Sequence, residues 1–205
     1  MNQIFQPRGY FAVPDGTDVS PFLNATDVTQ KDVPWGLLGK MSITGGRIGP
    51  KLHSWVHFHP VVTQVTYLLE GELTVRMKDA AAAQPYDLSL HPGNAVVTQA
   101  GTLFQLRNDG NAPAVVLYIV SPSYIFEVDD NGVRYDDAIL VAKTWEELVA
   151  LKYDLRALNI SLYEAMTRRE ESMRRLAQRR GINQPPLAQE TILFPVISTQ
   201  EPSQI

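Results

Sequence analysis

Short apolar segments recur along the middle of this chain, and each is bounded by glycine, proline or other turn-forming residues. Between Gly36 and Phe126 no segment with helical periodicity separates them. Regularly spaced short strands without intervening helices are typical of a β-sandwich or β-barrel. We therefore expect an all-β domain whose strands cover residues 40–44, 55–59, 65–69, 73–77, 86–90, 95–98, 103–107 and 114–120.

After these strands the pattern changes to a hairpin followed by helices. Asn131-Gly132 predicts a tight turn between two final strands, because these residues tolerate the positive φ angles of a type I′ turn. Residues 144–147 and 161–164 each match a capping box, in which a hydroxyl and a carboxylate satisfy free amides at a helix start. The second helix should end near Gly181, and the first should bury a leucine stripe at positions 148, 151, 155 and 158.

The beginning of the chain is expected to form an arm that pairs with the barrel or with a neighbouring subunit. Residues 10–13 can form a strand, and Pro14-Asp15-Gly16 supplies a turn. The arm and the two amphipathic helices present more apolar surface than one small barrel face needs, which predicts a homodimer. The chain then divides into an N-terminal arm (1–35), a β-barrel (36–142), a pair of C-terminal helices (143–183) and an extended tail (184–205).

Composition and charge narrow the range of partners. The net charge is −4 and the pI is about 5.5, which argues against binding to nucleic acid or to an acidic membrane surface. The chain contains no cysteine, so a metal site would have to use imidazole and oxygen donors. The first residues lack the apolar core of a signal peptide, and the longest apolar run, 114–120, is too short to cross a membrane. We expect a cytoplasmic protein that binds a small molecule.

The candidate chemistry lies at His57 and His59. Residues two apart in a strand point to the same face, so both imidazoles can be directed at one point inside a barrel. Gln64 follows after a turn and can return from the next strand with an amide oxygen. Packing alone does not explain two histidines at this spacing with a third donor nearby. We therefore expect His57, His59 and Gln64 to bind a metal ion.

This arrangement resembles the first motif of the cupin family, which reads His-x-His, four residues, a carboxylate, six residues and glycine. His57, His59 and Gly71 match it in spacing, and Gln64 stands where the family usually has glutamate. The resemblance implies a cupin jelly-roll barrel, also called a double-stranded β-helix, with a metal at its centre. Because an amide carries no charge, the ion would keep more of its positive charge than beside glutamate, which favours Lewis-acid chemistry.

A second and weaker cupin motif follows the first. Gly93, Gly101 and Asn108 fit this motif, whereas Gln99 replaces the family's proline. Phe104 stands at the position of the family's third histidine ligand. The resemblance therefore implies the barrel more strongly than it implies the complete metal site.

Three candidates can complete the coordination in place of Phe104. Gln105 could turn inward through a β-bulge, because one extra residue reverses the facing of a strand. His53 shares strand parity with the two histidines, and water could also fill the position.

The expected walls of the substrate pocket are Trp55, Tyr67, Phe104, Leu106 and His53.

The cupin resemblance implies a metal-dependent enzyme that acts on a small organic, apolar or aromatic substrate. Dioxygenase chemistry with iron(II) is the first expectation, and manganese, nickel or copper could replace the iron. A zinc-type cyclase, isomerase or lyase is the alternative that the neutral ligand set favours. A non-catalytic, ligand-binding cupin is the third possibility, because one histidine of the family's site is replaced.

Overall fold

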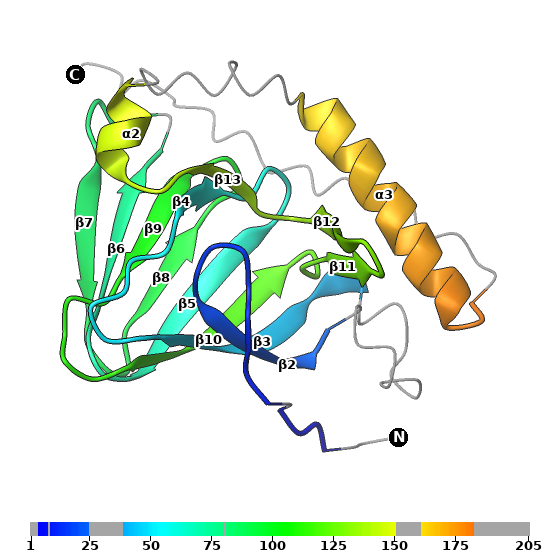
Figure 1. Ribbon diagram of the computed structural model, residues 1–205, viewed down its shortest axis with the longest axis horizontal. Coiled ribbons are helices and arrows are strands. Elements are labelled where there is room, and N and C mark those ends of the chain that lie inside the picture. The colour runs from blue at the N-terminus through cyan, green and yellow to red at the C-terminus, as the bar shows by residue number, and fades with distance from the viewer. Residues whose placement is uncertain (1–3, 8, 25–38, 80, 151–160, 183–205) are drawn as a thin grey trace, which may run out of the picture.

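The computed structural model describes residues 4–7, 9–24, 39–79, 81–150 and 161–182. Within them, two antiparallel sheets enclose an apolar core (Figure 1). The first sheet has the order β1-β2-β3-β10-β5-β8, with strands Phe11–Ala12, Asp18–Leu23, Ser42–Ile48, Ala114–Ser121, Thr63–Glu70 and Ala95–Thr98. The second has the order β13-β4-β9-β6-β7, with strands Ile139–Ala142, Val56–Phe58, Leu103–Arg107, Leu73–Lys78 and Tyr86–Leu90.

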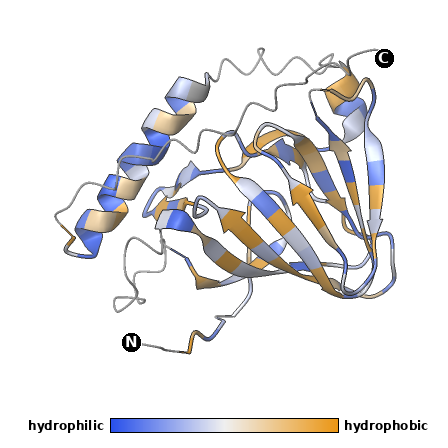
Figure 2. Ribbon diagram, turned by 180° about the vertical axis from the view of Figure 1, so that it is seen from behind, coloured by the Kyte–Doolittle hydropathy of each residue, from blue (hydrophilic) through white to orange (hydrophobic). Residues whose placement is uncertain are grey.

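The strand order confirms the jelly-roll prediction. In the first sheet, the late strand β10 lies between the early strands β3 and β5, and in the second sheet β9 lies between β4 and β6. Each sheet thus combines strands from the beginning and the end of the barrel, as in a jelly roll. In β10 the alternate residues Ala114, Val116, Tyr118 and Val120 are buried, which is the period of two that the sequence predicts. Figure 2 shows apolar residues concentrated on these strands.

Two residues of the family motifs have structural roles in the turns. Gly71 has φ 83°, and a Cβ at this position would lie 2.7 Å from the carbonyl oxygen of Pro113, so only glycine fits the turn between β5 and β6. Nδ2 of Asn108 donates hydrogen bonds to carbonyl oxygens of Ile48, Gly49 and Ala112 at 2.9 to 3.0 Å. Asn108 therefore ties the end of β9 to the end of β3.

The chain ends differ in part from the predictions. The arm pairs with the barrel, since β2 is hydrogen-bonded to β3, although the sequence pattern did not predict β2 or β13 as strands. The predicted hairpin forms from β11 (Phe126–Asp129) and β12 (Gly132–Asp136). Helix α2 is described only over Trp145–Ala150, so the later leucines of its predicted stripe lie outside the described residues, as does the tail.

Helix α3 (Leu162–Arg179) begins as predicted, with the amide of Glu164 donating to Oγ of Ser161 at 3.0 Å. Met173 and Leu176 pack in an apolar cluster with Leu23 and Ile125. The helix lies beside β11 and β12 (Figure 1). No helix in the described ranges is long and apolar enough to span a membrane.

Buried ion pairs join α3 to the barrel. Nε of Arg169 lies 3.1 Å from the carboxylate of Asp137, and its guanidinium also donates to the carbonyl oxygen of Ser123. Asp137 accepts further hydrogen bonds from the Tyr135 hydroxyl and the Ile125 amide. Burial raises the pKa of Asp137, although Arg169 and these hydrogen bonds act in the opposite direction.

A second buried carboxylate, Glu127 on β11, is surrounded in the same way. It accepts hydrogen bonds from Ser172 at 2.8 Å and from Arg175 at 2.8 Å, and Arg179 lies 3.0 Å away. Burial opposes the charged form of Glu127, but the bonds from Arg175 and Ser172 outweigh it and lower the pKa. Arg169, Arg175 and Arg179 therefore dock the helix onto the barrel.

Candidate active site

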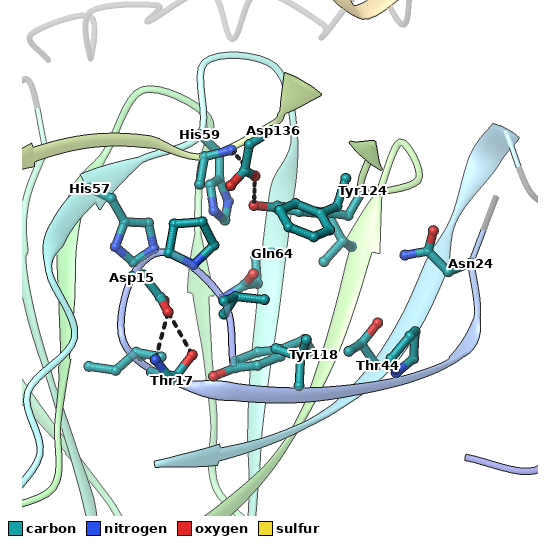
Figure 3. Close-up of a pocket in the computed structure, with 18 of the residues that line it drawn as sticks. Asp15, Thr17, Asn24, Thr44, His57, His59, Gln64, Tyr118, Tyr124 and Asp136 are labelled. Atoms are coloured by element: carbon teal, nitrogen blue, oxygen red, sulfur yellow. Dashed lines mark hydrogen bonds between the residues drawn. The ribbon is translucent and has the colours of Figure 1, made fainter. Parts of the chain in front are cut away.

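A pocket opens between the two sheets. The segment between β1 and β2 forms one wall, and it is tied to the second sheet where the Trp55 amide donates to the carbonyl oxygen of Asp15 at 2.8 Å. His57, His59 and Gln64 all line this pocket (Figure 3). The structure thus brings together the three residues that the first motif predicted as metal donors.

His57 is buried on β4, and its Nδ1 lies 2.7 Å from the carbonyl oxygen of Trp55. A carbonyl oxygen can only accept, so Nδ1 carries the hydrogen and Nε2 keeps its lone pair. Burial lowers the pKa of His57, although the charge of Asp15 and the bond to Trp55 act against it. The ring is therefore neutral at pH 7, with one nitrogen available to a ligand.

His59 follows directly after β4 and is 3% exposed. Burial holds the pKa of His59 well below its usual range, and His57 acts in the same direction. Among the described residues, Nδ1 of His59 is buried and has no hydrogen-bond partner. Buried polar atoms are nearly always partnered in folded proteins, so this nitrogen points to a ligand.

Gln64 lies on β5 with 6% of its surface exposed. Its Nε2 donates to Oγ1 of Thr66 at 3.1 Å, which fixes the amide plane. The amide oxygen Oε1 remains as the acceptor of this side chain. Gln64 thus adds a neutral oxygen donor to the two imidazoles.

These three residues could hold a divalent metal ion. Two imidazoles bound to one ion at ~2.1 Å place their ring centroids roughly 5 to 6 Å apart. The centroids of His57 and His59 are 5.5 Å apart. The bond from Nδ1 of His57 to a carbonyl oxygen is the outer contact that metal-bound histidines usually make. The described residues contain no group of three or more His, Cys, Asp or Glu side chains arranged for a metal.

Phe104 occupies the position of the family's third histidine. It is paired with His57 in the register of β4 and β9 and is fully buried in the barrel core. Its ring centroid lies 4.1 Å from that of His57 and 5.2 Å from that of His59. Phe104 therefore holds both imidazoles in place by packing and offers no donor atom.

Gln105 does not turn toward the pocket, and the β-bulge that the sequence allowed does not form. The register between β6 and β9 is continuous through Gln105. Its Nε2 donates to the carbonyl oxygens of Ser54 at 2.8 Å and Lys143 at 3.3 Å. The role of Gln105 in this arrangement is to connect backbone segments.

Of the residues predicted for the pocket walls, Leu106 lines the pocket, whereas His53, Trp55, Tyr67 and Phe104 do not. His53 is exposed, with Nε2 2.7 Å from the carboxylate of Asp109. Trp55 and Tyr67 are half-buried and do not line the pocket, and the Lys143 ammonium lies 5.4 Å from the centroid of the Trp55 ring.

Seven polar residues of the pocket were not predicted as site residues: Asp15, Thr17, Asn24, Thr44, Tyr118, Tyr124 and Asp136 (Figure 3). Tyr118 shares strand parity with buried valines in β10, so its inward direction could have been found from the sequence. Asp15 and Asp136 come from the arm and the terminal hairpin. Only the folded structure brings these segments to the barrel.

Tyr124 and Asp136 form a hydrogen-bonded pair beside the imidazoles. The Tyr124 hydroxyl lies 2.5 Å from Oδ1 of Asp136, and its ring centroid lies 5.4 Å from that of His59. Burial raises the pKa of Asp136 to about 6, although the bonds from Tyr124 and the Ala138 amide oppose the shift. Burial also raises the pKa of Tyr124 well above its usual value, and the charge of Asp136 adds to this. A group that can exchange a proton near neutral pH thus lies in the pocket.

Comparisons with known proteins agree with this architecture. Residues 46–120 match the family model described as the cupin domain. The tetracenomycin polyketide synthase protein TcmJ of Streptomyces glaucescens is 29% identical over 87 residues, which is 42% of this chain and 51% of TcmJ. The chain thus spans about half the length of that relative.

Two solved structures illustrate the likeness in fold at low sequence identity. Peruvianin-I, described as a cysteine peptidase from Thevetia peruviana latex, superimposes with a TM-score of 0.50 at 16% identity, covering 68% of this chain and 74% of that chain. KdgF from Halomonas sp. gives a TM-score of 0.43 at 15% identity, covering 56% and 88%. At such identities the likeness concerns the fold alone, and the present chain contains no cysteine.

Proposed function

The barrel of this chain is a cupin domain, and we propose that its pocket is the active site of an enzyme acting on a small, largely apolar organic substrate. One observation carries the proposal. Nε2 of His57, Nδ1 of His59 and Oε1 of Gln64 belong to buried side chains of one pocket, and no hydrogen bond within the described chain uses them. Of these, Nδ1 of His59 is fully buried, and because burying a polar atom without a partner destabilises a fold, a ligand or metal is its natural partner.

His57, His59 and Gln64 would hold a divalent transition metal. All three donors are neutral, so the ion would retain its full positive charge. When bound, such an ion would polarise a carbonyl or phenolic oxygen of the substrate. The role of the protein would be to orient the substrate and to exclude water with the apolar part of the pocket.

Of the two reaction classes, we propose proton-transfer chemistry of the cyclase, isomerase or lyase type, for which zinc would suffice. The hydrogen-bonded pair of Tyr124 and Asp136 lies beside His59 and can take a proton from the substrate and return it. Iron(II) oxygenases commonly use two histidines and one carboxylate, and Gln64 does not supply that carboxylate. The two histidines keep iron-dependent dioxygenation as the second candidate.

The substrate we propose is aromatic or polyketide-like. The pocket walls include Phe11, Val13, Leu106, Val120, Phe126 and Leu140, which present apolar and aromatic surface to a ring system. The relative TcmJ is described as a tetracenomycin polyketide synthase protein, which supports the same substrate class.

Metal titration of the full chain tests this proposal. After chelator treatment, Zn²⁺ and, without oxygen, Fe²⁺ are titrated into the wild type, the double variant His57→Ala/His59→Ala and the control His53→Ala. We expect one site in the wild type and the control. Affinity should fall by at least ~100-fold in the double variant, since even outer partners of metal ligands change affinity by 10- to 100-fold.

Equal affinity in the wild type and the double variant would refute the metal site. The reaction class is tested separately by incubating the metal-loaded protein with hydroxylated polycyclic ketones in the presence and absence of oxygen. Turnover that continues without oxygen supports proton transfer. Turnover that requires oxygen and consumes it supports the dioxygenase.

A further inference from the structure

Tyr118 lies along one side of the pocket, and its hydroxyl has no partner. The residue is 7% exposed, and the phenolic oxygen is buried without a hydrogen bond among the described residues. Burial raises the pKa of Tyr118 well above its usual value, and the charge of Asp15 adds to this. The hydroxyl is therefore a neutral group that can donate a hydrogen bond to a ligand.

The backbone of β3 fixes the position of this ring. A Cβ at Gly46 would lie 2.2 Å from Cε2 and 2.7 Å from Cζ of Tyr118. Gly46 is not among the described glycines with positive φ, so its backbone conformation does not require glycine. The absence of a side chain at Gly46 instead makes room for the phenol ring, which indicates that the fold accommodates Tyr118 at this place.

Stability does not explain the hydroxyl. Burying a hydroxyl without a partner destabilises a folded protein, and phenylalanine would fill the same space without that penalty. The rest of the ring packs in the barrel core with Val116 and Val120. The apolar core does not need the Tyr118 hydroxyl. Because Tyr118 lines the pocket, its hydroxyl is suited to contact a ligand bound there.

Asp15 adds a hydrogen-bond acceptor to the same part of the pocket. Its Oδ1 accepts hydrogen bonds from the amide and the hydroxyl of Thr17 at 2.9 and 2.8 Å, so the carboxylate is held in place (Figure 3). Both bonds go to Oδ1, which leaves Oδ2 for a ligand hydroxyl. Tyr118 and Asp15 line the same pocket (Figure 3).

We propose that Tyr118 and Asp15 form a binding subsite for an oxygenated ring, with Tyr118 donating to a carbonyl-type oxygen and Asp15 accepting from a neighbouring hydroxyl. The inference rests on the proposed function, because it assigns the functional groups of the substrate that the same pocket would bind. The subsite uses none of the three proposed metal donors. The two proposals can therefore fail independently.

Binding of four naphthalene probes to chelator-treated full-length protein tests the subsite without a contribution from a metal. The probes are ortho-hydroxyacetonaphthone, acetonaphthone, naphthol and ethylnaphthalene, which carry both oxygen groups, the carbonyl alone, the hydroxyl alone and neither. Dissociation constants are measured by fluorescence titration. In the wild type we expect the probe with both groups to bind most tightly and ethylnaphthalene most weakly.

The variants should separate the two contacts. Tyr118→Phe should weaken both carbonyl probes by about tenfold and leave naphthol unchanged, since a hydrogen bond from a neutral donor contributes roughly that much. Asp15→Asn should weaken the two hydroxyl probes and leave acetonaphthone unchanged. Tyr67→Phe is the matched control, because Tyr67 lies on the same sheet outside the pocket, and it should change neither.

Melting temperatures distinguish a binding role from a structural one. Tyr118→Phe should melt at the same temperature as the wild type or higher, whereas Gly46→Ala should melt lower and weaken the same carbonyl probes, because the added methyl displaces the ring. Unchanged carbonyl binding in Tyr118→Phe, a lower melting temperature for that variant, or equal wild-type affinity for all four probes would overturn the subsite. Wild-type binding of none of the probes would do the same. If the subsite fails in this way but the metal titration still shows one site, the proposed function stands. If the metal titration shows no site but the probes bind as expected, only the proposed function is refuted.

Discussion

Asp136 and Asp137 are neighbours in the chain, yet they belong to two buried polar clusters of opposite character. Asp137 belongs to the docking cluster, by which we mean the carboxylates of Asp137 and Glu127 and the α3 side chains that bind them. The Arg169 guanidinium pairs with Asp137, and the Tyr135 hydroxyl donates to it. Asp136 lines the barrel pocket, where its side chain accepts from Tyr124 and the local Ala138 amide. Adjacent residues of an extended chain point to opposite sides, and here the two sides have different tasks.

The difference lies in where the partners come from. In the docking cluster, the carboxylates of Asp137 and Glu127 have several donors from α3 and its surroundings. In the pocket, Nδ1 of His59 and the hydroxyl of Tyr118 have none among the described residues. The two pocket atoms differ from the carboxylates under α3 in that a ligand in the pocket could supply their missing partner.

The largest expected effect belongs to the docking cluster. Arg169→Ala would leave Asp137 buried without its cation, and the side chains are only 7% and 1% exposed. We expect the free energy of unfolding to fall by about 3 to 5 kcal/mol, as found when one partner of a buried ion pair is removed. Urea denaturation measures this change.

Arg168→Ala is the matched control for that experiment. The side chain of Arg168 is 64% exposed and pairs with Glu164 along the helix surface. Its removal should change the free energy of unfolding by less than about 0.5 kcal/mol. Similar losses in both variants would show that the contribution of Arg169 is not specific to the buried cluster.

The second-largest effect concerns Asp136. Here substitution should raise the free energy of unfolding, whereas Arg169→Ala lowers it. Its pKa of about 6 in the folded protein exceeds the ordinary value of 3.8, mainly through burial, so the folded state holds the proton more tightly than the unfolded state. Stability is then fully present below about pH 4 and is lost as the pH rises through 6. The loss amounts to about 2 to 3 kcal/mol at 1.36 kcal/mol per pKa unit.

Asp136→Asn removes this ionisation while keeping an acceptor for Tyr124. The variant should be about 2 kcal/mol more stable than the wild type above pH 6.5 and equally stable near pH 4. In both proteins Tyr124 donates to this side chain, and the charges of Asp137 and Asp15 act on it. Denaturation from pH 4 to 8 measures the difference, and a variant that loses stability relative to the wild type as the pH rises would contradict the assignment.

Local spacing was enough to predict most of the fold and half of the site. The strands follow from alternation of apolar residues, as β10 shows, and the positions of His57, His59 and Gln64 follow from strand parity and the length of one turn. Phe104 was also expected at the third ligand position, where its ring packs on both imidazoles.

The remainder of the site depends on contacts that no local pattern encodes. Asp15 reaches the pocket because the arm pairs with β3, and Asp136 reaches it because the terminal hairpin lies against the barrel. Gln105 and His53 were candidates by parity or by a possible bulge. Their side chains instead bond with backbone carbonyls and with Asp109, and only the folded structure reveals these partners.

The smallest effect tests whether Gln64 belongs with the unpartnered atoms of the pocket. If its Oε1 is a metal donor, Gln64→Glu should tighten Zn²⁺ binding by about tenfold, or ~1.4 kcal/mol, because a carboxylate is the stronger donor. Turnover should fall at the same time, since the added charge makes the ion less electrophilic.

Gln105→Glu is the matched control. That amide donates to two carbonyl oxygens away from the pocket, so the change should destabilise the fold without tightening metal binding. Titration of metal-stripped proteins, together with thermal melts, separates the outcomes. If Gln64→Glu behaves like the control, with a lower melting temperature and no gain in affinity, the amide is a structural group and the metal would rest on the two histidines alone.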